Sequence, residues 1–434
     1  MEYIKRAIED IVLGVDKTFK SVLITGARQT GKTKLIRTLF ADKKYVAIDD
    51  PFVEDQAINN PNMFMMLNQP PVIFDEVQRA PELFRFIKIA CDSSEEKGLF
   101  CLSGSQPLEL MERASESLSG RIGIIEMLPL SQREIDRDSF NKPFIPTMEY
   151  VQERNNTAKM PSNLWERIHR GGYPELQDSE VDWGIFFSSY VKTYLERDVR
   201  KLTAVHDLND FRRFMVAAAA RTGQMVNYSN IADEIGKDQA TVKSWMSILE
   251  SSGIIFMLEP YTPSVLKRAI KTPKLYFRDT GLAAYLTRWL TPETLAAGAM
   301  SGAFFETFVI SEILKSYANR GVDYRYSVSY YRGKDKIRTR KNGETFEQES
   351  EIDLIIEENG VLHPIEIKQS ANVTADATSA FTVLDRVNDK TRGMGAVICC
   401  CPQPGMLREN IIQSSPFGLS ERMTGEGHDG IIKM

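Results

Sequence analysis

The 434-residue sequence has little of what marks a membrane-embedded or disulfide-rich protein. No apolar run approaches the ~18 residues of a membrane span, and Glu9, Asp10 and Asp16 interrupt the place of a signal core. Five cysteines, three of them consecutive (399–401), do not predict a disulfide framework, and we interpret the triplet as a buried strand. A net charge of −5 argues against coating of nucleic acid but leaves local basic patches open. We expect a cytoplasmic protein without a membrane partner.

The clearest motif is a phosphate-binding loop. Residues 26–33, Gly-Ala-Arg-Gln-Thr-Gly-Lys-Thr, fit the required pattern between an apolar strand-like run (21–25) and a helical segment (34–40). The glycines let backbone N–H groups turn toward phosphate oxygens at a helix N-terminus. The lysine would reach the β- and γ-phosphates, and the last threonine would ligate Mg²⁺. We expect ATP to contact Gly26, Ala27, Arg28, Gln29, Thr30, Gly31, Lys32 and Thr33.

A second apolar run ends in two adjacent carboxylates. Residues 71–74 are typical of a strand, and Asp75 and Glu76 follow directly. Such a strand end is the usual partner of a phosphate loop, so we assign Asp75 to the magnesium ion. Glu76 is then placed to polarise the attacking water as a general base. An acidic strand end followed by a solvated helix is the alternative.

Polar residues after later strands complete the expected hydrolytic site. Ser105 or Gln106 is a candidate sensor of the γ-phosphate, with a plain turn as an equal alternative. Arg121 could stabilise the transferred charge, from this subunit or from a neighbour in a homo-oligomer, and a structural salt bridge is the alternative. Arg6 could touch the base, but we favour a solvated surface position. The expected catalytic set is Lys32, Glu76, Ser105 and Arg121.

The middle of the chain alternates helical stretches with Pro and Gly breaks. Residues 131–200 fit a helical lid and connector, and 201–290 follow the helix–turn–helix–strand order of a winged helix. In its second helix one apolar face is formed by Val242, Trp245, Met246 and Leu249. The outer face offers few polar readers, and phosphate contacts could come from Lys267, Arg268, Lys271 and Lys274. DNA binding and protein docking both stay open.

An Asn-Gly pair predicts a β-hairpin in the last third of the chain. Residues 351–356 and 363–368 alternate around Asn359-Gly360, whose turn requires positive φ at both positions. A two-residue loop places Asp353 opposite Glu366, with Lys368 on the same face. The other face is then shared by Ile352, Leu354, Ile356, Ile365 and Ile367.

Two opposed carboxylates repel each other unless a cation lies between them. A second divalent metal would satisfy Asp353 and Glu366, with Lys368 orienting or activating a water. The alternative is an exposed polar face in which Lys368 bridges both acids. Upstream, basic and acidic runs around 342–343 predict an extra hairpin over 334–349, either a DNA-gripping arm or a solvated ribbon.

Several different short motifs are spread along most of the chain. Besides residues 26–33 they are Ile-Phe-Asp-Glu-Val-Gln (73–78), Leu-Ser-Gly-Ser (102–105), Ser-Gly-Arg (119–121), Leu-Pro-Leu-Ser (128–131), Gly-Gly-Tyr-Pro-Glu (171–175), Tyr-Leu-Glu-Arg-Asp (194–198) and Tyr-Phe-Arg-Asp-Thr-Gly-Leu (276–282). Together they resemble the prokaryotic AAA-type ATPases that carry a C-terminal DUF4143 region. The resemblance implies a AAA+ core with a helical lid, and it leaves open what the ATP is used for.

The C-terminal acids carry a second resemblance. Asp353, followed on the next strand by Glu366 and Lys368, is similar to the PD-(D/E)xK nuclease superfamily, although Ile352 stands in place of the proline. Glu306, in a helical segment at 304–310, supplies the further acid of that pattern as a metal ligand. The expected order of helix, strand (324–331), hairpin, helix (374–388) and strand (396–401) agrees with that core.

The sequence thus predicts an α/β protein of five parts. They are a P-loop AAA+ core (1–130), a helical lid and connector (131–200), a winged helix (201–290), a restriction-endonuclease-like domain (291–402) and a tail (403–434). We expect a Mg²⁺-dependent ATPase that acts on or with DNA, with a nuclease-like C-terminal domain. The alternative is a nucleotide-switched protein-interaction module whose C-terminal domain is an inactive scaffold.

Overall fold

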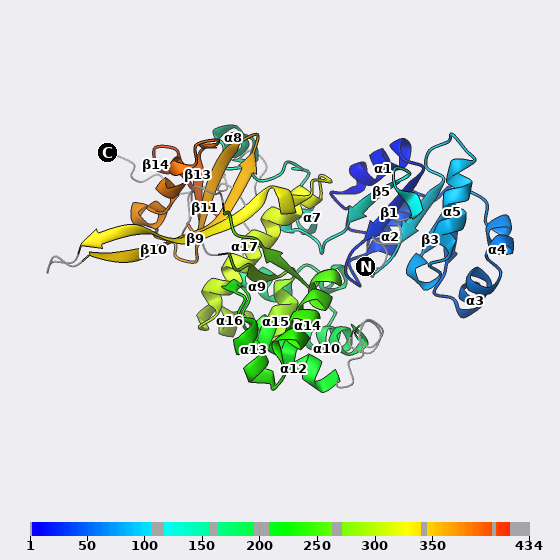
Figure 1. Ribbon diagram of the computed structural model, residues 1–434, viewed down its shortest axis with the longest axis horizontal. Helices are drawn as coiled ribbons and strands as arrows, with labels where there is room; N and C mark the ends of the chain where they lie inside the picture. Colours follow the sequence, from blue (N-terminus) through cyan, green and yellow to red (C-terminus); the bar gives the residue numbers. More distant parts are fainter. Residues whose placement is uncertain are drawn as a thin grey trace, which may run out of the picture. The chain divides into compact units, whose positions relative to one another are not determined.

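A computed structural model describes residues 2–105, 117–155, 163–194, 199, 208–262, 271–339, 345–401 and 405–416 (Figure 1). The chain divides into two compact units. The first comprises residues 1–143, 165–258 and 272–326, and the second comprises 144–164, 259–271 and 327–434. Within the described ranges, no helix has both the length and the apolar character that a bilayer crossing demands.

The first unit contains a five-stranded parallel sheet in the order β2-β3-β4-β1-β5. Its strands are β1 (Ser21–Thr25), β2 (Lys44–Ala47), β3 (Val72–Asp75), β4 (Phe100–Ser103) and β5 (Ile122–Glu126). The helices are α1 (Glu9–Thr18), α2 (Lys32–Leu39), α3 (Pro51–Asn59), α4 (Pro61–Leu67) and α5 (Leu83–Asp92), with the 3-10 turn η1 (Val77–Arg79) after β3. Apolar side chains fill both faces, because strands of a parallel sheet are covered by helices on each side.

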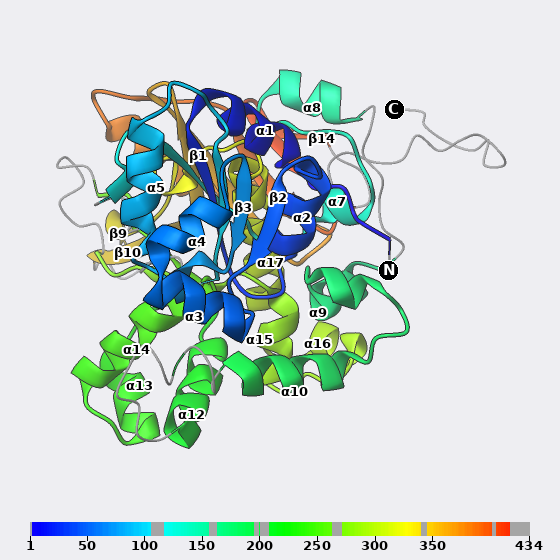
Figure 2. The same ribbon diagram turned by 90° about the vertical axis from the view of Figure 1, so that its right-hand side faces the viewer.

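The two faces of this sheet build separate cores. Leu23 packs with buried residues of α3, α4 and α5, whereas its neighbours Val22 and Ile24 pack with residues of α1 and α2. Figure 2 shows the same division of the helices between the two sides of the strands. β1 and β3 both pair with β4 in parallel. The loops that follow the carboxyl ends of β1 and β3 therefore lie at the same edge of the sheet.

The rest of the first unit is mainly helical. Its elements are α7 (Gln132–Ile135), α9 (Leu164–Arg170), η2 (Pro174–Gln177), α10 (Trp183–Tyr194), α12 (Leu208–Ala219), β6 (Gln224–Met225), α13 (Tyr228–Ile235), α14 (Gln239–Ser251), β7 (Ile255–Leu258), β8 (Lys274–Phe277), α15 (Thr280–Leu286), α16 (Pro292–Ala297), α17 (Ser301–Ala318) and η4 (Tyr324–Tyr326). Its three strands pair antiparallel in the order β6-β8-β7, with β6 before α13 and α14 in the chain and β7 and β8 after them. Asp238 caps α14 by accepting from Thr241 N at 2.8 Å. The predicted apolar face of this helix is buried at Val242, Trp245, Met246 and Leu249, which confirms its periodicity.

The second unit is a sheet in the order β14-β15-β13-β11-β10-β9, with β12 beside β11. Its elements are α8 (Met148–Asn155), β9 (Val328–Thr339), β10 (Thr345–Glu358), β11 (Val361–Lys368), η5 (Ala375–Thr378), η6 (Phe381–Arg386), β12 (Thr391–Arg392), β13 (Gly395–Cys399), β14 (Gly405–Arg408) and β15 (Ile411–Ser414). β9 and β10 pair out to Thr339 and Thr345, forming the long ribbon seen in Figure 1. The predicted turn at 342–343 lies outside the described residues.

The Asn-Gly hairpin is confirmed. Asn359 and Gly360 have φ of 51° and 78°, and the pairs run from Glu358 with Val361 to Leu354 with Ile365, in the predicted register. One detail of the facing is wrong. A bulge in β10 against β9 brings Ile352 into the same core cluster as Ile355, because an extra residue in one strand interrupts strict alternation.

Two smaller expectations in this unit also change. The helix expected over 374–388 is replaced by the two 3-10 turns η5 and η6. This stretch is rich in Ser, Thr and Val, which disfavour a continuous α-helix. The cysteine triplet lies at the end of β13, where Cys399 and Cys401 are buried and all three cysteines are free thiols.

Candidate nucleotide site

The loop between β1 and α2 has the shape that its glycines allow. Gly26 has φ of 137°, and a Cβ at this position would lie 2.2 Å from the carbonyl oxygen of Met127. Gly31 has φ of 95° and immediately precedes α2, which begins at Lys32. A side chain at Gly26 would therefore collide with backbone, and the loop keeps its N–H groups at the start of a helix, where they attract anions.

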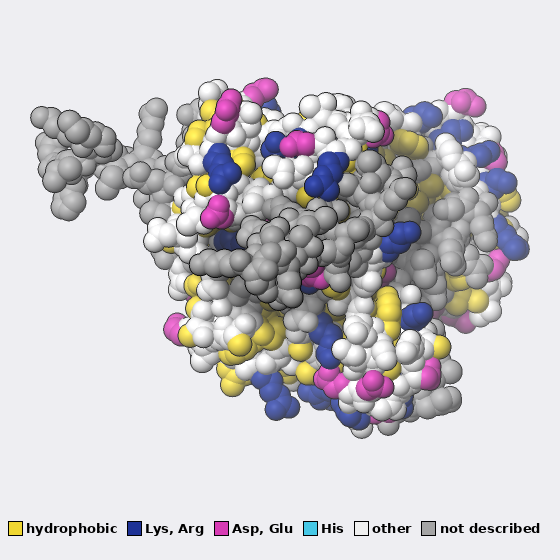
Figure 3. Space-filling view, turned by 60° about the vertical axis from the view of Figure 1, so that its left-hand side comes forward, with side chains coloured by type: hydrophobic (Ala, Val, Ile, Leu, Met, Phe, Trp, Pro, Cys, Tyr) yellow, Lys and Arg dark blue, Asp and Glu magenta, His cyan; other side chains and the backbone are white. Residues whose placement is uncertain are grey.

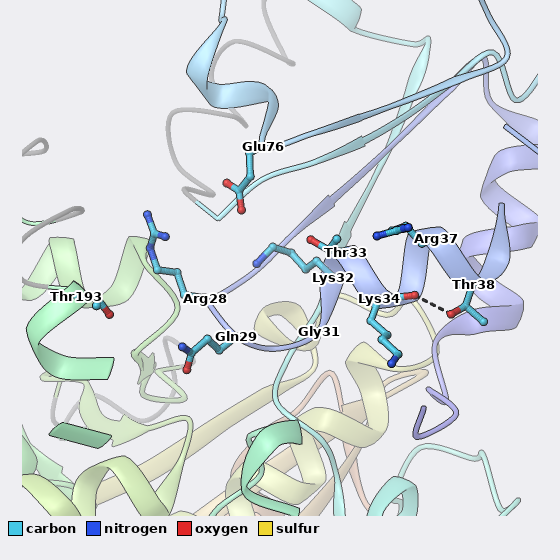
Figure 4. Close-up of a pocket in the computed structure, with 10 residues that line it drawn as sticks. All are labelled: Arg28, Gln29, Gly31, Lys32, Thr33, Lys34, Arg37, Thr38, Glu76 and Thr193. Carbon is cyan, nitrogen blue, oxygen red and sulfur yellow. Dashed lines mark hydrogen bonds between the residues drawn. The ribbon is translucent and has the colours of Figure 1, made fainter. Parts of the chain in front are cut away.

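Lys32 is buried at the centre of this loop. Its ammonium donates to the carbonyl oxygens of Gly26 and Ala27 at 2.9 and 2.8 Å. Figure 4 shows Lys32 extending toward the same space as Arg28 and Glu76. The Lys32 ammonium is therefore in place to bind phosphate oxygens instead of these two carbonyl groups.

Asp75, the last residue of β3, accepts hydrogen bonds from side chains of α2, β2 and β4. Its Oδ2 accepts from the Thr33 hydroxyl at 2.8 Å and from the Tyr45 hydroxyl at 2.7 Å, and its Oδ1 accepts from Ser103. Burial, followed by the hydrogen bond to Asp75, raises the pKa of Tyr45 above its usual range, so the phenol stays a donor. The structure thus brings the two predicted magnesium ligands, Thr33 and Asp75, into direct contact.

Glu76 projects from a sharp turn after β3. Its φ is 57°, a left-handed conformation that is uncommon outside glycine and often found at functional sites. The carboxylate accepts from Gln78 and, at 3.2 Å, from the Ser105 hydroxyl. Ser105, proposed from sequence as a γ-phosphate sensor, therefore contacts the expected general base, while Gln106 lies outside the described residues.

Two arginines considered from the sequence have other partners. Arg121 donates to Asp92 at 2.9 Å and to the Ser119 carbonyl at 2.8 Å, which is the salt-bridge alternative. A role for Arg121 toward a neighbouring subunit stays a prediction. Arg6 is not a solvated surface residue: it is 3% exposed and forms an ion pair with Glu134 at 2.8 Å.

Two cavities lined by described residues border the loop. The larger, of about 740 Å³, is lined by Arg28, Gln29, Gly31, Lys32, Thr33, Lys34, Arg37, Thr38, Glu76 and Thr193 (Figure 4). A smaller one, of about 110 Å³, also borders Gly31 and Lys34, and its wall includes Tyr3, Ile4, Leu130 and Pro174. Sequence reasoning missed Tyr45, Gln78, Thr193 and Pro174. Gln78 and Pro174 lay in quoted motifs but were given no role, whereas Tyr45 and Thr193 reach the site from elements whose packing no local pattern shows.

The C-terminal acids are only partly brought together. In the second unit, Lys368 Nζ lies 2.5 Å from Glu366 Oε1 and 4.0 Å from Asp353 Oδ2, and Asp353 also accepts from the Ile367 backbone. Burial, and then the nearby Asp353, raises the pKa of Glu366 to about 8. Its Oε2 is buried without a hydrogen-bond partner.

Glu306, predicted as a further metal ligand, has partners of its own, and its role as a ligand stays a prediction. It lies on α17 in the first unit, where it accepts from the Tyr276 hydroxyl at 2.5 Å and pairs with Lys274 at 3.2 Å. Lys274, predicted to contact phosphates from a wing, is itself only 3% exposed. Across the described part of the chain, no cluster of three or more His, Cys, Asp or Glu side chains could hold a metal ion.

Three family models match the chain. A AAA domain covers residues 18–136, a domain of unknown function (DUF8612) covers 161–293, and a domain of unknown function (DUF4143) covers 301–414. A AAA domain and a C-terminal DUF4143 domain thus occur together in this chain, as in a AAA-type ATPase with a DUF4143 region. The match confirms the resemblance drawn from the short motifs and places the loop, Asp75 and Glu76 inside a nucleotide-binding domain.

Two mycobacterial proteins are similar to this chain. The uncharacterized protein Rv2008c of Mycobacterium tuberculosis is 26% identical over 367 residues, which span 84% of this chain and 74% of the relative, and Mb2031c of Mycobacterium bovis gives the same values. Among solved structures, the Walker-type ATPase PabY2304 of Pyrococcus abyssi is 14% identical and covers 65% of this chain and 96% of its own, with a TM-score of 0.40.

Proposed function

We propose that this AAA-type protein binds and hydrolyses ATP with Mg²⁺ at the loop of residues 26–33. The observation that carries the proposal is the contact of Thr33 with Asp75, because a hydroxyl and a carboxylate at this spacing are the usual protein ligands of the magnesium ion. Bound Mg²⁺ would neutralise charge on the β- and γ-phosphates. Lys32 would then donate to the phosphate oxygens in place of its carbonyl partners.

Glu76 is the residue best placed to act on water. Gln78 and Ser105 fix one carboxylate oxygen, which leaves the other to accept a proton from an attacking water. The water oxygen would bond to the γ-phosphorus, the bond to the β,γ-bridging oxygen would break, and ADP and phosphate would leave. The small cavity beside Pro174 and Tyr3 supports an apolar binding site for the adenine base of ATP.

The test separates binding from hydrolysis. Glu76→Gln should keep ATP affinity in calorimetry but reduce turnover by about 10²-fold or more, whereas Lys32→Ala should lose affinity. Glu82→Gln, a change to an exposed acid in the same segment, is the matched control. ATP turnover unchanged in Glu76→Gln would remove the general-base assignment, and unchanged affinity in Lys32→Ala would remove the phosphate site.

We propose further that the second unit is a metal-dependent, nuclease-like domain that works on DNA. The buried Glu366 oxygen without a hydrogen-bond partner, beside Asp353 and Lys368, supports this proposal because a divalent metal would give that oxygen a partner. Two protein carboxylates with waters would suit Mg²⁺ or Mn²⁺. Glu306 is not part of this proposal because its carboxylate already accepts from Tyr276 and pairs with Lys274.

Supercoiled plasmid with Mg²⁺ or Mn²⁺ tests cleavage, and Mn²⁺ binding by electron paramagnetic resonance tests the metal alone. Asp353→Ala should lose both nicking and the bound Mn²⁺ of the second unit, while Asp385→Asn, an acid on the surface of that unit, should change neither. Bound metal without nicking would favour a DNA-binding scaffold. Neither metal nor nicking would favour the protein-interaction module.

The winged-helix-like part supports protein docking as strongly as DNA binding. The outward face of α14 is formed by Gln239, Ala240, Lys243, Ser244, Ser247 and Glu250, with one cation among them. On the face drawn in Figure 3, Lys and Arg lie among Asp and Glu rather than in one basic surface. Stimulation of the ATPase rate by DNA would favour the nucleic-acid function, and its absence the nucleotide-switched module.

A further inference from the structure

The helical hairpin of α3 and α4 presents an apolar face to solvent. Met63, Met66 and Leu67 occupy positions i, i+3 and i+4 of α4, and their side chains are 57%, 68% and 60% exposed. Phe52 on α3 is exposed by 71%. Phe64 points the opposite way, into the core shared with α5, and is 2% exposed. A stable surface helix normally turns such a stripe inward, so α4 carries one apolar side for folding and a second that is unused.

Charge within the α3–α4 segment has one sign. From Tyr45 to Gln78 the sequence contains no lysine or arginine, while Asp49, Asp50 and Asp55 are exposed at the beginning of α3. The two flanking cations are already engaged. Lys44 donates to the Leu67 carbonyl at 2.9 Å, and Arg79 pairs with Glu54 at 2.7 Å. These acidic residues disfavour a phosphate backbone or an anionic lipid surface as the occupant and favour a cationic partner.

The chemistry of the face specifies the partner further. Methionine and leucine at helical spacing pack against another helix with adaptable side chains, and an apolar stripe of this kind is read by an amphipathic helix through i, i+3 and i+4 anchors. We propose that the α3–α4 face is a docking surface for a cationic amphipathic helix of a partner protein. Figures 1 and 2 show the two helices side by side, on the sheet face that α5 also covers.

The docking surface is connected to the nucleotide site. Glu54 of α3 holds Arg79, the last residue of η1, and that turn begins directly after Glu76. A helix seated on α3 would therefore act on the turn that directly follows the expected general base. This connection depends on the proposed ATPase function, whereas the docking itself does not, so binding is measured first and without nucleotide.

A synthetic helical peptide of Leu and Lys, with leucines at i, i+3 and i+4, is the probe. Fluorescence anisotropy should show binding to the full chain, and Met66→Ser/Leu67→Ser should weaken it by about tenfold or more. Asp49→Asn/Asp55→Asn should weaken it and reduce its salt dependence. Ile185→Ser changes a side chain that is 69% exposed on α10 and should leave the affinity unchanged. Thermal melting confirms that each variant is folded.

Three results would overturn the proposal. One is equal affinity for a peptide in which glutamate replaces every lysine, because charge would then play no part. Another is unchanged affinity in both the Met66→Ser/Leu67→Ser and the Asp49→Asn/Asp55→Asn proteins. The third is a self-associated chain in sedimentation whose association Met66→Ser/Leu67→Ser abolishes, since a second copy would then cover the face. Loss of ATP turnover in Lys32→Ala with peptide binding intact would leave the docking surface standing independently of the ATPase assignment.

Discussion

Arg6 and Glu134 form a buried ion pair whose removal should loosen the nucleotide site. Both side chains are at most 3% exposed, and Arg6 Nε donates to Glu134 at 2.8 Å. The same guanidinium donates to the carbonyls of Thr30, in the phosphate loop, at 2.9 Å, and of Leu128 at 2.8 Å. Arg6→Gln would leave a fully buried carboxylate without its cation and two carbonyls without their donor. Breaking a buried pair in this way costs about 3–5 kcal/mol.

The assay can be aimed at the carboxylate itself. Glu134 accepts from the backbone N–H groups of Ala7 at 2.9 Å and Ser131 at 2.7 Å, so hydrogen exchange of these two amides reports local opening. Arg6→Gln should lower their opening free energy by about 3 kcal/mol or more and weaken ATP binding through Thr30. Arg167→Gln is the matched control, because it removes a partly exposed pair with Asp136 from the same region. Its cost should stay below about 1 kcal/mol.

The pH dependence has a definite sign. Burial raises the pKa of Glu134, but Arg6 and the backbone donors outweigh it and hold the pKa below the usual 4.5. In the wild type this group stabilises the fold above that value, and the contribution is lost as the pH falls through the lowered pKa. Without Arg6 the pKa rises, so the deficit of Arg6→Gln should be largest at neutral pH and shrink on acidification. A deficit that is absent, or that is the same at every pH, would refute the reasoning.

Three further predictions concern single positions. Gly26→Ala should abolish ATP binding in calorimetry, because its Cβ would meet the Met127 carbonyl at 2.2 Å, whereas Gly14→Ala, with nothing within 4 Å, should not change it. Glu366, with its pKa raised to about 8 by burial and Asp353, should make the wild type lose stability as the pH rises through about 5 to 8, and Glu366→Gln should flatten that slope in calorimetric melting. Gly360→Ala, at φ of 78°, should cost about 1–2 kcal/mol in denaturant melts, whereas Gly405→Ala in open space should cost less.

Local patterns account for what the sequence could predict. The phosphate loop, the carboxylates after β3, the apolar face of α14 and the Asn-Gly turn each lie within a few residues, and each imposes its own backbone geometry. The register of β10 against β11 follows from that turn alone. The bulge that moves Ile352 could not be predicted because it depends on pairing with β9, where the extra residue has its partner.

Distance along the chain explains what sequence reasoning missed. Arg6 meets Glu134 across 128 positions, and Tyr45 meets Asp75 across 30. Neither pair has a spacing that a helix or strand period would reveal. Glu306 also has partners that its place in the sequence did not reveal. Its order along the chain matches a nuclease pattern, yet a tyrosine and a lysine from β8 satisfy the carboxylate, because order in sequence does not place a side chain in space.

The segment after β5 shows how the phosphate loop and α17 depend on each other. Its Met127 carbonyl is the atom that requires glycine at position 26. Three residues farther on, Leu130 donates to Gly172 at 2.8 Å and accepts from Lys315 of α17 at 3.1 Å. Because packed elements shift between discrete arrangements rather than deform continuously, a nucleotide that moves the loop at Gly26 must either carry this segment and α17 with it or break these bonds. The helix α17, on which the DUF4143 match begins, therefore lies on the same connected set of contacts as the phosphate loop.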